Sequence, residues 1–105
     1  MDHDRIDEDR EAACVFMRMQ PLLFDGTRRT VSLAAWLHDM EQIFRTCHIE
    51  ARLQVSLASR CLVLDARFWW MTVGERELPS RTWADFCTLL IAHYGPILDE
   101  GAEAP

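Results

Sequence analysis

The chain has 105 residues, of which half are hydrophobic and 27% are charged, and its formal net charge is −6. This length suits one domain with one core, and this composition excludes a disordered chain, a collagen-like fibre and a low-complexity linker for most of the length. The negative charge is concentrated at the ends: residues 1–11 carry −4 and residues 97–105 carry −3. All eleven basic residues are arginine. This excludes phosphate-loop and Schiff-base lysines, and no basic stripe is left for a nucleic-acid backbone.

The cysteines and the absence of targeting signals indicate where the protein resides. The four cysteines are far apart and form no C-x-x-C pair, and the N-terminus is acidic where a signal peptide needs a basic start. The longest stretch without a formal charge, residues 86–98, is shorter than the about 20 apolar residues of a membrane-spanning helix. We therefore expect free thiols in a soluble, intracellular protein of the cytoplasm or the nucleus, without a membrane segment.

The chain begins with an acidic leader at residues 1–20. Its apolar run at residues 12–17 is compatible with a short helix that ends before Pro21. A turn-rich segment follows, in which Gly26 suits a backbone conformation that other residues resist.

The clearest predicted helix covers residues 32–47. Ser32 is a suitable N-cap, and the apolar residues after it recur at the i, i+3, i+4, i+7 spacing of one helical face. These residues are Leu33, Trp36, Leu37, Met40, Ile43, Phe44 and Cys47. The helix therefore has one buried face and one wet face.

Two apolar segments follow, and the pattern predicts helices over residues 50–64 and 65–73. The first has apolar residues on more than one face, so we expect it to be central. Asp65 is a suitable cap for the second, and Gly74 suits its C-terminus. The pattern leaves open whether the two helices form one continuous rod.

The last predicted helix covers residues 82–94. Thr82-Trp83-Ala84-Asp85 matches the capping pattern that opens a helix, and Gly95-Pro96 is expected to end it. Residues 97–105 are expected to form a disordered acidic tail. Since no convincing strand pair is present, the predicted fold class is all-α.

No group of polar residues supports catalysis or metal binding. His48-Ile49-Glu50 has the spacing of a zinc deaminase motif, but the P-C-x-x-C that would complete the metal site is missing. Cys47 and His48 are neighbours, and neighbours on a helix point about 100° apart. We therefore expect no enzyme, no metal, no cofactor and no small-molecule substrate.

The four tryptophans are the unusual feature of this composition, because they fall on three different predicted helices. Core packing is the default explanation for large aromatic residues. Adjacent Trp69 and Trp70 cannot share one helix face, however. One of them is expected to contact a different partner, which is either another element or another chain.

Four blocks of residues follow one another at characteristic spacings. They are Pro21-x-x-Phe24-x-Gly26, Trp36-Leu37-x-x-x-Glu41-x-x-Phe44, Ala58-x-x-x-Leu62-x-x-x-Ala66-x-x-Trp69-Trp70 and Thr82-Trp83-x-x-Phe86-x-x-Leu89-x-x-x-x-Tyr94. In this order they resemble the Gag domain of Gypsy-type LTR retrotransposons over residues 21–96. The sequence departs from that family at Leu64, where glycine is usual, and it contains neither a second capsid half nor a zinc knuckle.

The resemblance implies a small orthogonal bundle of four to five helices like a capsid N-lobe. Its function would be structural: self-association through Gag–Gag contacts in a retrotransposon particle, without catalysis and without direct nucleic-acid binding by this part. The alternative is a domesticated or degenerate Gag-derived module that binds a peptide or protein partner. The motif and core residues that the resemblance assigns are Phe24, Gly26, Trp36, Leu37, Phe44, Leu62, Ala66, Trp69, Trp70, Trp83, Phe86 and Tyr94.

Overall fold

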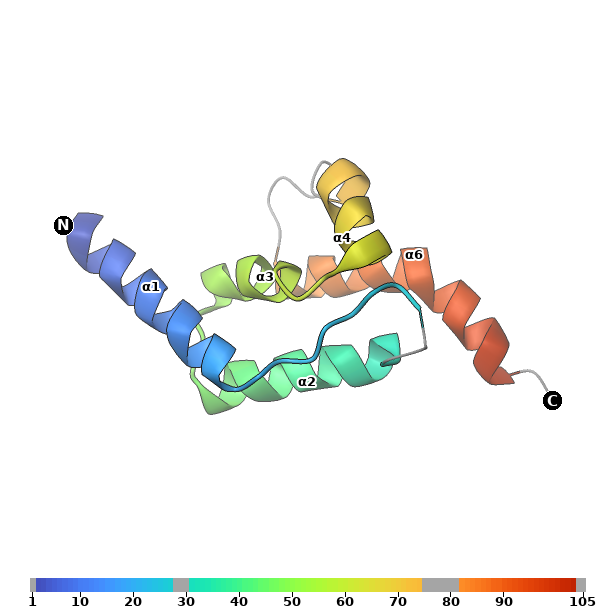
Figure 1. Cartoon of the computed structure of the whole chain (residues 1–105), viewed down its shortest axis with the longest axis horizontal. Helices are drawn as coiled ribbons and strands as arrows, with labels where there is room; N and C mark the ends of the chain where they lie inside the picture. The colour runs from blue at the N-terminus through green and yellow to red at the C-terminus, as the bar shows by residue number, and fades with distance from the viewer. Residues whose placement is uncertain (1, 28–30, 75–81, 104–105) are drawn as a thin grey trace.

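The computed structural model describes residues 2–27, 31–74 and 82–103, and this part of the chain is all-α. Its elements in chain order are α1 (Asp2–Arg18), α2 (Leu33–Thr46), α3 (Ala51–Ser59), α4 (Leu64–Trp69), the π-helical turn η1 (Trp70–Gly74) and α6 (Trp83–Glu103). Figure 1 shows α2 below α3 and α6, with α4 standing out above them and the two termini at opposite ends. The predicted fold class is therefore confirmed, and the predicted loop at residues 75–81 lies outside the described residues.

Helix α1 is much longer than the short helix expected within the acidic leader. Its last turns are anchored by Phe16, which is fully buried and stacks on Phe44 with ring centroids 6.0 Å apart. Nearer its start, Asp9 accepts from Arg52 at 2.7 Å. Because residues 2–18 contain neither glycine nor proline and one side of the helix packs on α3, the leader is helical rather than unstructured.

Helix α2 confirms the helix predicted at residues 32–47. The Ser32 hydroxyl accepts from the backbone N–H of Ala35 at 3.1 Å, so this residue is the N-cap. The buried residues of the helix are Leu33, Trp36, Met40, Ile43 and Phe44. This stripe packs against α6, as the 3.6-residue periodicity requires.

Helix α3 ends at Ser59, five residues before the predicted end at residue 64, so it is not continuous with α4. The chain leaves the helix because Leu62 pairs with Phe24 in an isolated parallel bridge. Helix α4 then begins at Leu64 with Val63 as its N-cap. The prediction that Asp65 caps this helix was therefore wrong, since Asp65 lies inside its first turn.

Helix α6 begins as predicted but does not end as predicted. The Thr82 hydroxyl accepts from the N–H of Asp85 at 3.1 Å, and an Asp85 carboxylate oxygen accepts from the N–H of Thr82 at 3.4 Å. The helix runs through Gly95-Pro96 to Glu103, so the predicted end at residue 94 and the expected disordered tail at residues 97–103 were wrong. A proline keeps a helical φ and removes one hydrogen bond, which bends or weakens a helix without requiring it to stop.

One hydrophobic core joins the elements from α1 to α6. Its largest fully buried side chains are Trp36, Phe16, Phe24, Phe86, Met40, Leu62, Leu90 and Cys61. The indole N–H of Trp36 donates to the carbonyl oxygen of Leu22 at 2.9 Å, which satisfies its one polar group. No polar or charged residue is buried within the part of the chain that the structure describes.

Candidate functional site

The twelve motif residues assigned by resemblance lie in or beside the core. Three are half-buried, namely Gly26, Leu37 and Trp83, and the others are buried. Their rings are interlocked: Phe24 lies 5.7 Å from Trp36 between centroids, and Trp36 lies 6.4 Å from Phe86. This arrangement gives the motif a packing role and leaves little of it on the surface.

Trp69 and Trp70 are both buried, although the sequence suggested that one of them could contact another chain. Trp69 contacts Tyr94 of α6, with centroids 5.4 Å apart, while Trp70 contacts Phe86 of the same helix at 5.0 Å. The two rings therefore have different partners, and both partners belong to the same neighbouring element. A π-helical turn begins at Trp70, and its wider winding separates adjacent side chains by a smaller angle than an α-helix does.

Gly26 occupies a tight site against α6. Its φ is +94°, and a Cβ atom there would lie 3.2 Å from the Cε1 atom of Tyr94. The turn is fixed by Asp25, whose carboxylate accepts from the N–H of Thr27 at 2.8 Å and from its hydroxyl at 2.7 Å. The conformational role predicted for Gly26 is confirmed.

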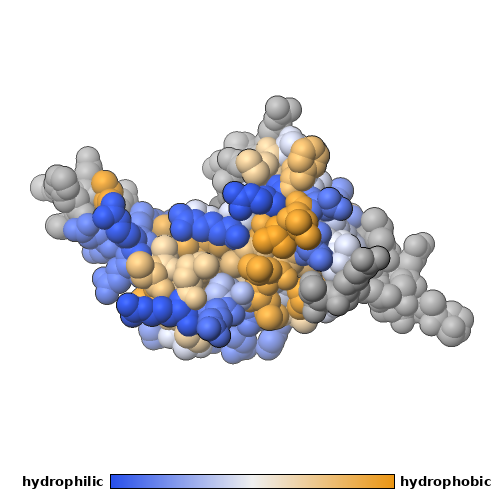
Figure 2. All heavy atoms as spheres, viewed as in Figure 1, coloured by the Kyte–Doolittle hydropathy of each residue, from blue (hydrophilic) through white to orange (hydrophobic). Residues whose placement is uncertain are grey.

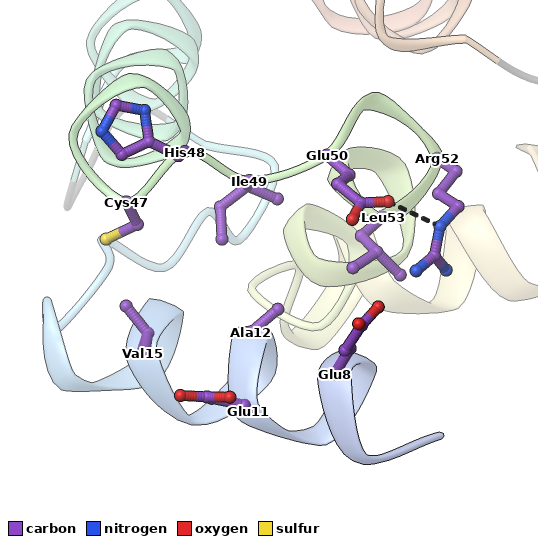
Figure 3. A pocket seen from close by; sticks show the side chains of 10 residues that line it. All are labelled: Glu8, Glu11, Ala12, Val15, Cys47, His48, Ile49, Glu50, Arg52 and Leu53. Carbon is purple, nitrogen blue, oxygen red and sulfur yellow. Dashed lines mark hydrogen bonds and ion pairs between the residues drawn. The ribbon is translucent and has the colours of Figure 1, made fainter. Parts of the chain in front are cut away.

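A groove of about 320 Å³ lies between α1 and the turn that joins α2 to α3. Figure 3 shows Ala12 and Val15 of α1 on one side of it and Ile49 and Leu53 on the other. The polar residues that line it are Glu8, Glu11, Cys47, His48, Glu50 and Arg52. The floor is thus apolar and the rim is mainly acidic.

The polar residues of this groove do not converge on one point. The Cys47 thiol and the His48 ring point in different directions in Figure 3, so they do not form a nucleophile and its base. Arg52 donates to Glu50 at 2.8 Å as well as to Asp9, and these hydrogen bonds, that to Asp9 first, raise its pKa. Within the described residues, no group of three or more His, Cys, Asp or Glu side chains could hold a metal ion.

Among the described residues, the three most exposed large hydrophobic side chains lie on α4 and η1. Leu64, Phe68 and Met71 recur at the i, i+4, i+7 spacing of one helical side, and they are 74%, 70% and 60% exposed. Leu22 and Leu23, in the segment before α2, are also exposed. Figure 2 shows hydrophobic atoms in a band that runs from α4 down over this segment. We call these five residues the α4 face.

The backbone at Leu64 is strained. Its φ is +52°, in the left-handed region, where an L-residue with a Cβ costs about 1–2 kcal/mol relative to the right-handed region. This is the position where the resemblance leads one to expect glycine. Because the Leu64 side chain is mostly exposed, it contributes little to the core of its own chain.

Sequence reasoning missed the α4 face. Leu64 falls at the end of the helix predicted over residues 50–64, and Phe68 and Met71 fall within the helix predicted over residues 65–73, whose pattern does not separate them from the tryptophans beside them. The available signal was the segment 66–71, which is too rich in apolar residues for a single buried stripe. An apolar helix of this kind must leave some of those residues outside a small core.

Comparison with known protein families gives a match over most of the chain. A protein family described as "Retrotransposon-derived protein PEG10, N-terminal capsid-like domain" matches residues 18–95, from the end of α1 to well within α6. No match was found among curated proteins or among solved structures. Among the described residues, no helix has both the length and the apolar character needed to cross a membrane.

Proposed function

Because this chain belongs to the family of PEG10-type retrotransposon-derived N-terminal capsid-like domains, we propose that it is an assembly module that associates with copies of itself. We propose residues 21–96 as the capsid-like unit, with α1 as an addition at its N-terminal side. A capsid subunit acts through contacts with its neighbours, so this function requires an accessible surface and does not require a catalytic site. Association in a retrotransposon particle is the setting that the family name suggests.

The observation that carries this proposal is the exposed α4 face. Large aliphatic and aromatic side chains are usually removed from water, and a contiguous apolar patch of several hundred Å² on a soluble protein marks an interaction surface. Here Leu64, Phe68 and Met71 are each more than half exposed on the side of α4 opposite the buried Trp69. The core therefore uses one side of this helix and leaves the other to a partner.

A second candidate function is capture of a peptide or protein partner in the groove between α1 and the α2–α3 turn. The observation in its favour is the combination of an apolar floor with the carboxylates of Glu8 and Glu11 at the rim. This chemistry suits a short segment with an apolar side chain and a nearby basic one. The groove is open, which makes it the weaker of the two candidates.

The four free thiols support a reducing compartment as the place of action. Cys61 is fully buried, and burial raises its pKa to about 11. A thiol of this kind stays protonated and reduced. We place the protein in the cytoplasm or the nucleus on this basis.

The test of self-association is the mass of the purified chain over a wide range of concentrations, from sedimentation velocity and light scattering. A weight-average mass that rises with concentration is the expected result. A mass that stays at 12.2 kDa at every concentration overturns self-association and leaves the groove as the candidate to pursue. The same series at low and high salt separates apolar contacts, which persist in salt, from ionic ones.

A further inference from the structure

We propose that α4 of one copy packs in parallel against α4 of a second copy, with Leu64 and Phe68 at the centre of the contact. This proposal rests on the self-association proposed above and names its surface. Four features of α4 carry it: the backbone at Leu64, the rigidity of the helix, the charges beside the stripe and the area of the face.

The first feature is the strained conformation of Leu64. A glycine would adopt the φ of +52° without a steric penalty, yet the chain has a leucine there that is 74% exposed. Among the residues that the structure describes, the mostly exposed Leu64 side chain gains little from the core, so its own burial does not offset the strain. Backbone strain of this kind is found mainly at residues with a functional role. Contact with a partner would give the exposed Leu64 such a role.

The second feature is that α4 is held rigidly from its other side. Ala66, Trp69 and Trp70 are buried, and the two indoles are fixed against α6. The start of the helix is fixed by the hydrogen bond from the N–H of Val63 to the carbonyl oxygen of Phe24, at 2.9 Å. The exposed residues are therefore presented in one geometry, which lowers the entropy cost of binding.

The third feature is the pair of opposite charges that flank the stripe. Asp65 lies on one side of the line from Leu64 to Phe68, and Arg67 lies on the other, since successive residues are about 100° apart on a helix. A two-fold axis parallel to α4 brings Asp65 of one copy opposite Arg67 of the other. An antiparallel pairing would instead bring like charges together, so the charges favour the parallel arrangement.

The fourth feature is the area of the face. A large apolar side chain has roughly 150–250 Å² of surface, so five such residues, exposed by 42% to 74%, present on the order of 500 Å². A stable interface takes about 800 Å² from each partner. The pairing is thus expected to be weak in an isolated pair, and to be strengthened where many copies are held together.

The experiment compares the wild-type chain with Phe68→Glu by sedimentation velocity over the same range of concentrations. Phe68 is 70% exposed, so the charge is tolerated by the monomer and should oppose only the contact. The expected result is a dissociation constant at least tenfold weaker. The matched control is Ile6→Glu, a change of equal charge at a residue that is 51% exposed on α1, away from α4; it should leave the constant unchanged.

A charge exchange tests the parallel arrangement without touching the apolar stripe. Asp65→Arg alone should weaken association about two- to fivefold, since it places two arginines opposite each other. The double variant Asp65→Arg with Arg67→Asp should restore the wild-type constant. If the double variant associates more weakly than either single variant, the parallel pairing is wrong.

These outcomes separate the two proposals. A wild-type chain that is monomeric at all concentrations overturns both self-association and the α4 pairing. A wild-type chain that associates while Phe68→Glu associates equally well overturns the α4 pairing alone, as does an equal loss in Ile6→Glu. If Phe68→Glu lowers the thermal midpoint strongly, the charge exchange, which leaves all apolar residues in place, decides the question.

Discussion

Phe24 and Leu62 form a parallel bridge between two parts of the chain that are nearly forty residues apart. The N–H of Phe24 donates to the carbonyl oxygen of Cys61, and the N–H of Val63 donates to the carbonyl oxygen of Phe24, both at 2.9 Å. Since both side chains are fully buried, the bridge joins the segment before α2 to the core. It also determines where α3 ends and how α4 leaves it.

The adjacent residues Phe68 and Trp69 are expected to differ sharply in their effect on stability. Trp69→Ala removes a buried indole from its contacts with Tyr94 and His93 and should cost about 3–5 kcal/mol of unfolding free energy. Phe68→Ala removes an exposed ring and should change it by less than about 0.5 kcal/mol. Urea denaturation at a low protein concentration measures both. A cost below about 1 kcal/mol for Trp69→Ala would show that this ring is not part of the core.

Leu64→Gly is expected to stabilise the monomer. Relief of the left-handed strain contributes about 1–2 kcal/mol, and the greater freedom of glycine in the unfolded chain offsets about 0.4–1 kcal/mol of it. A net gain of about 0.5–1 kcal/mol should appear as a higher urea midpoint. Leu64→Ala is the control, because it removes the exposed side chain but keeps the strain, and it should change the midpoint little. A lower midpoint for Leu64→Gly would contradict the strain.

Gly26→Ala is expected to destabilise the fold by more than about 1 kcal/mol. The new Cβ would meet the ring of Tyr94 at 3.2 Å, and the φ of +94° disfavours any residue with a Cβ. Gly95→Ala is the control for the backbone conformation: a Cβ there would also lie 3.2 Å from a side-chain atom, Cγ2 of Ile91, but Gly95 lies in α6 without a positive φ, and Ile91 is half exposed. The midpoint of thermal unfolding should therefore fall for Gly26→Ala, and it should rise or stay unchanged for Gly95→Ala.

The cysteines are expected to differ in reactivity. Burial, with a smaller contribution from the charge of Asp39, raises the pKa of Cys61 from 9.0 to about 11, so its thiolate fraction near pH 8 falls about a hundredfold. Cys14 is exposed and should react first with iodoacetamide, while Cys61 should react only when the chain unfolds. Mass spectrometry of the alkylated peptides gives the order. Equal rates for Cys14 and Cys61 would contradict the burial of Cys61.

The same pKa predicts how stability depends on pH. Burial also raises the pKa of Cys87 to about 11, with a smaller contribution from Glu41. The folded state thus holds both protons more tightly than the unfolded state does. The two protonated thiols contribute fully to the free energy of unfolding below about pH 9, and this contribution is lost as the pH rises towards 11. Urea midpoints between pH 8 and 11 should therefore fall, and Cys87→Ala should reduce that fall.

Binding to RNA is expected to be weak. The chain between the acidic ends is close to neutral, and its arginines form no continuous stripe in the sequence, so few counterions would be released on binding. Fluorescence anisotropy with a labelled single-stranded RNA at physiological salt should show no submicromolar binding. Tight binding with a steep dependence on salt would contradict this expectation.

Some elements of the fold could be predicted from local patterns. The Ser32 cap with its apolar stripe defined α2, and the pairing of Thr82 with Asp85 defined the start of α6. Both depend on residues three or four positions apart, and such contacts form within a single helix. The four motif blocks likewise indicated the capsid-like family, because their order and spacing are visible in the sequence before the packing of the helices is known.

The candidate interaction surface could not be predicted in this way. Phe68 and Trp69 are neighbours of similar hydrophobicity, and only the position of α6 decides that Trp69 is buried while Phe68 faces water. The left-handed backbone of Leu64 likewise follows from the bridge between Phe24 and Leu62.

Local sequence patterns were enough to predict the all-α class, the family, the position of α2 and the start of α6, because these follow from the spacing of residues along the chain. The tertiary structure alone decided where α3 ends, how far α6 runs, which tryptophan contacts which ring, and which apolar residues of α4 stay outside. The reason is that hydrophobicity favours the removal of a side chain from water but does not specify its neighbours. Burial depends on neighbours that are distant in the chain.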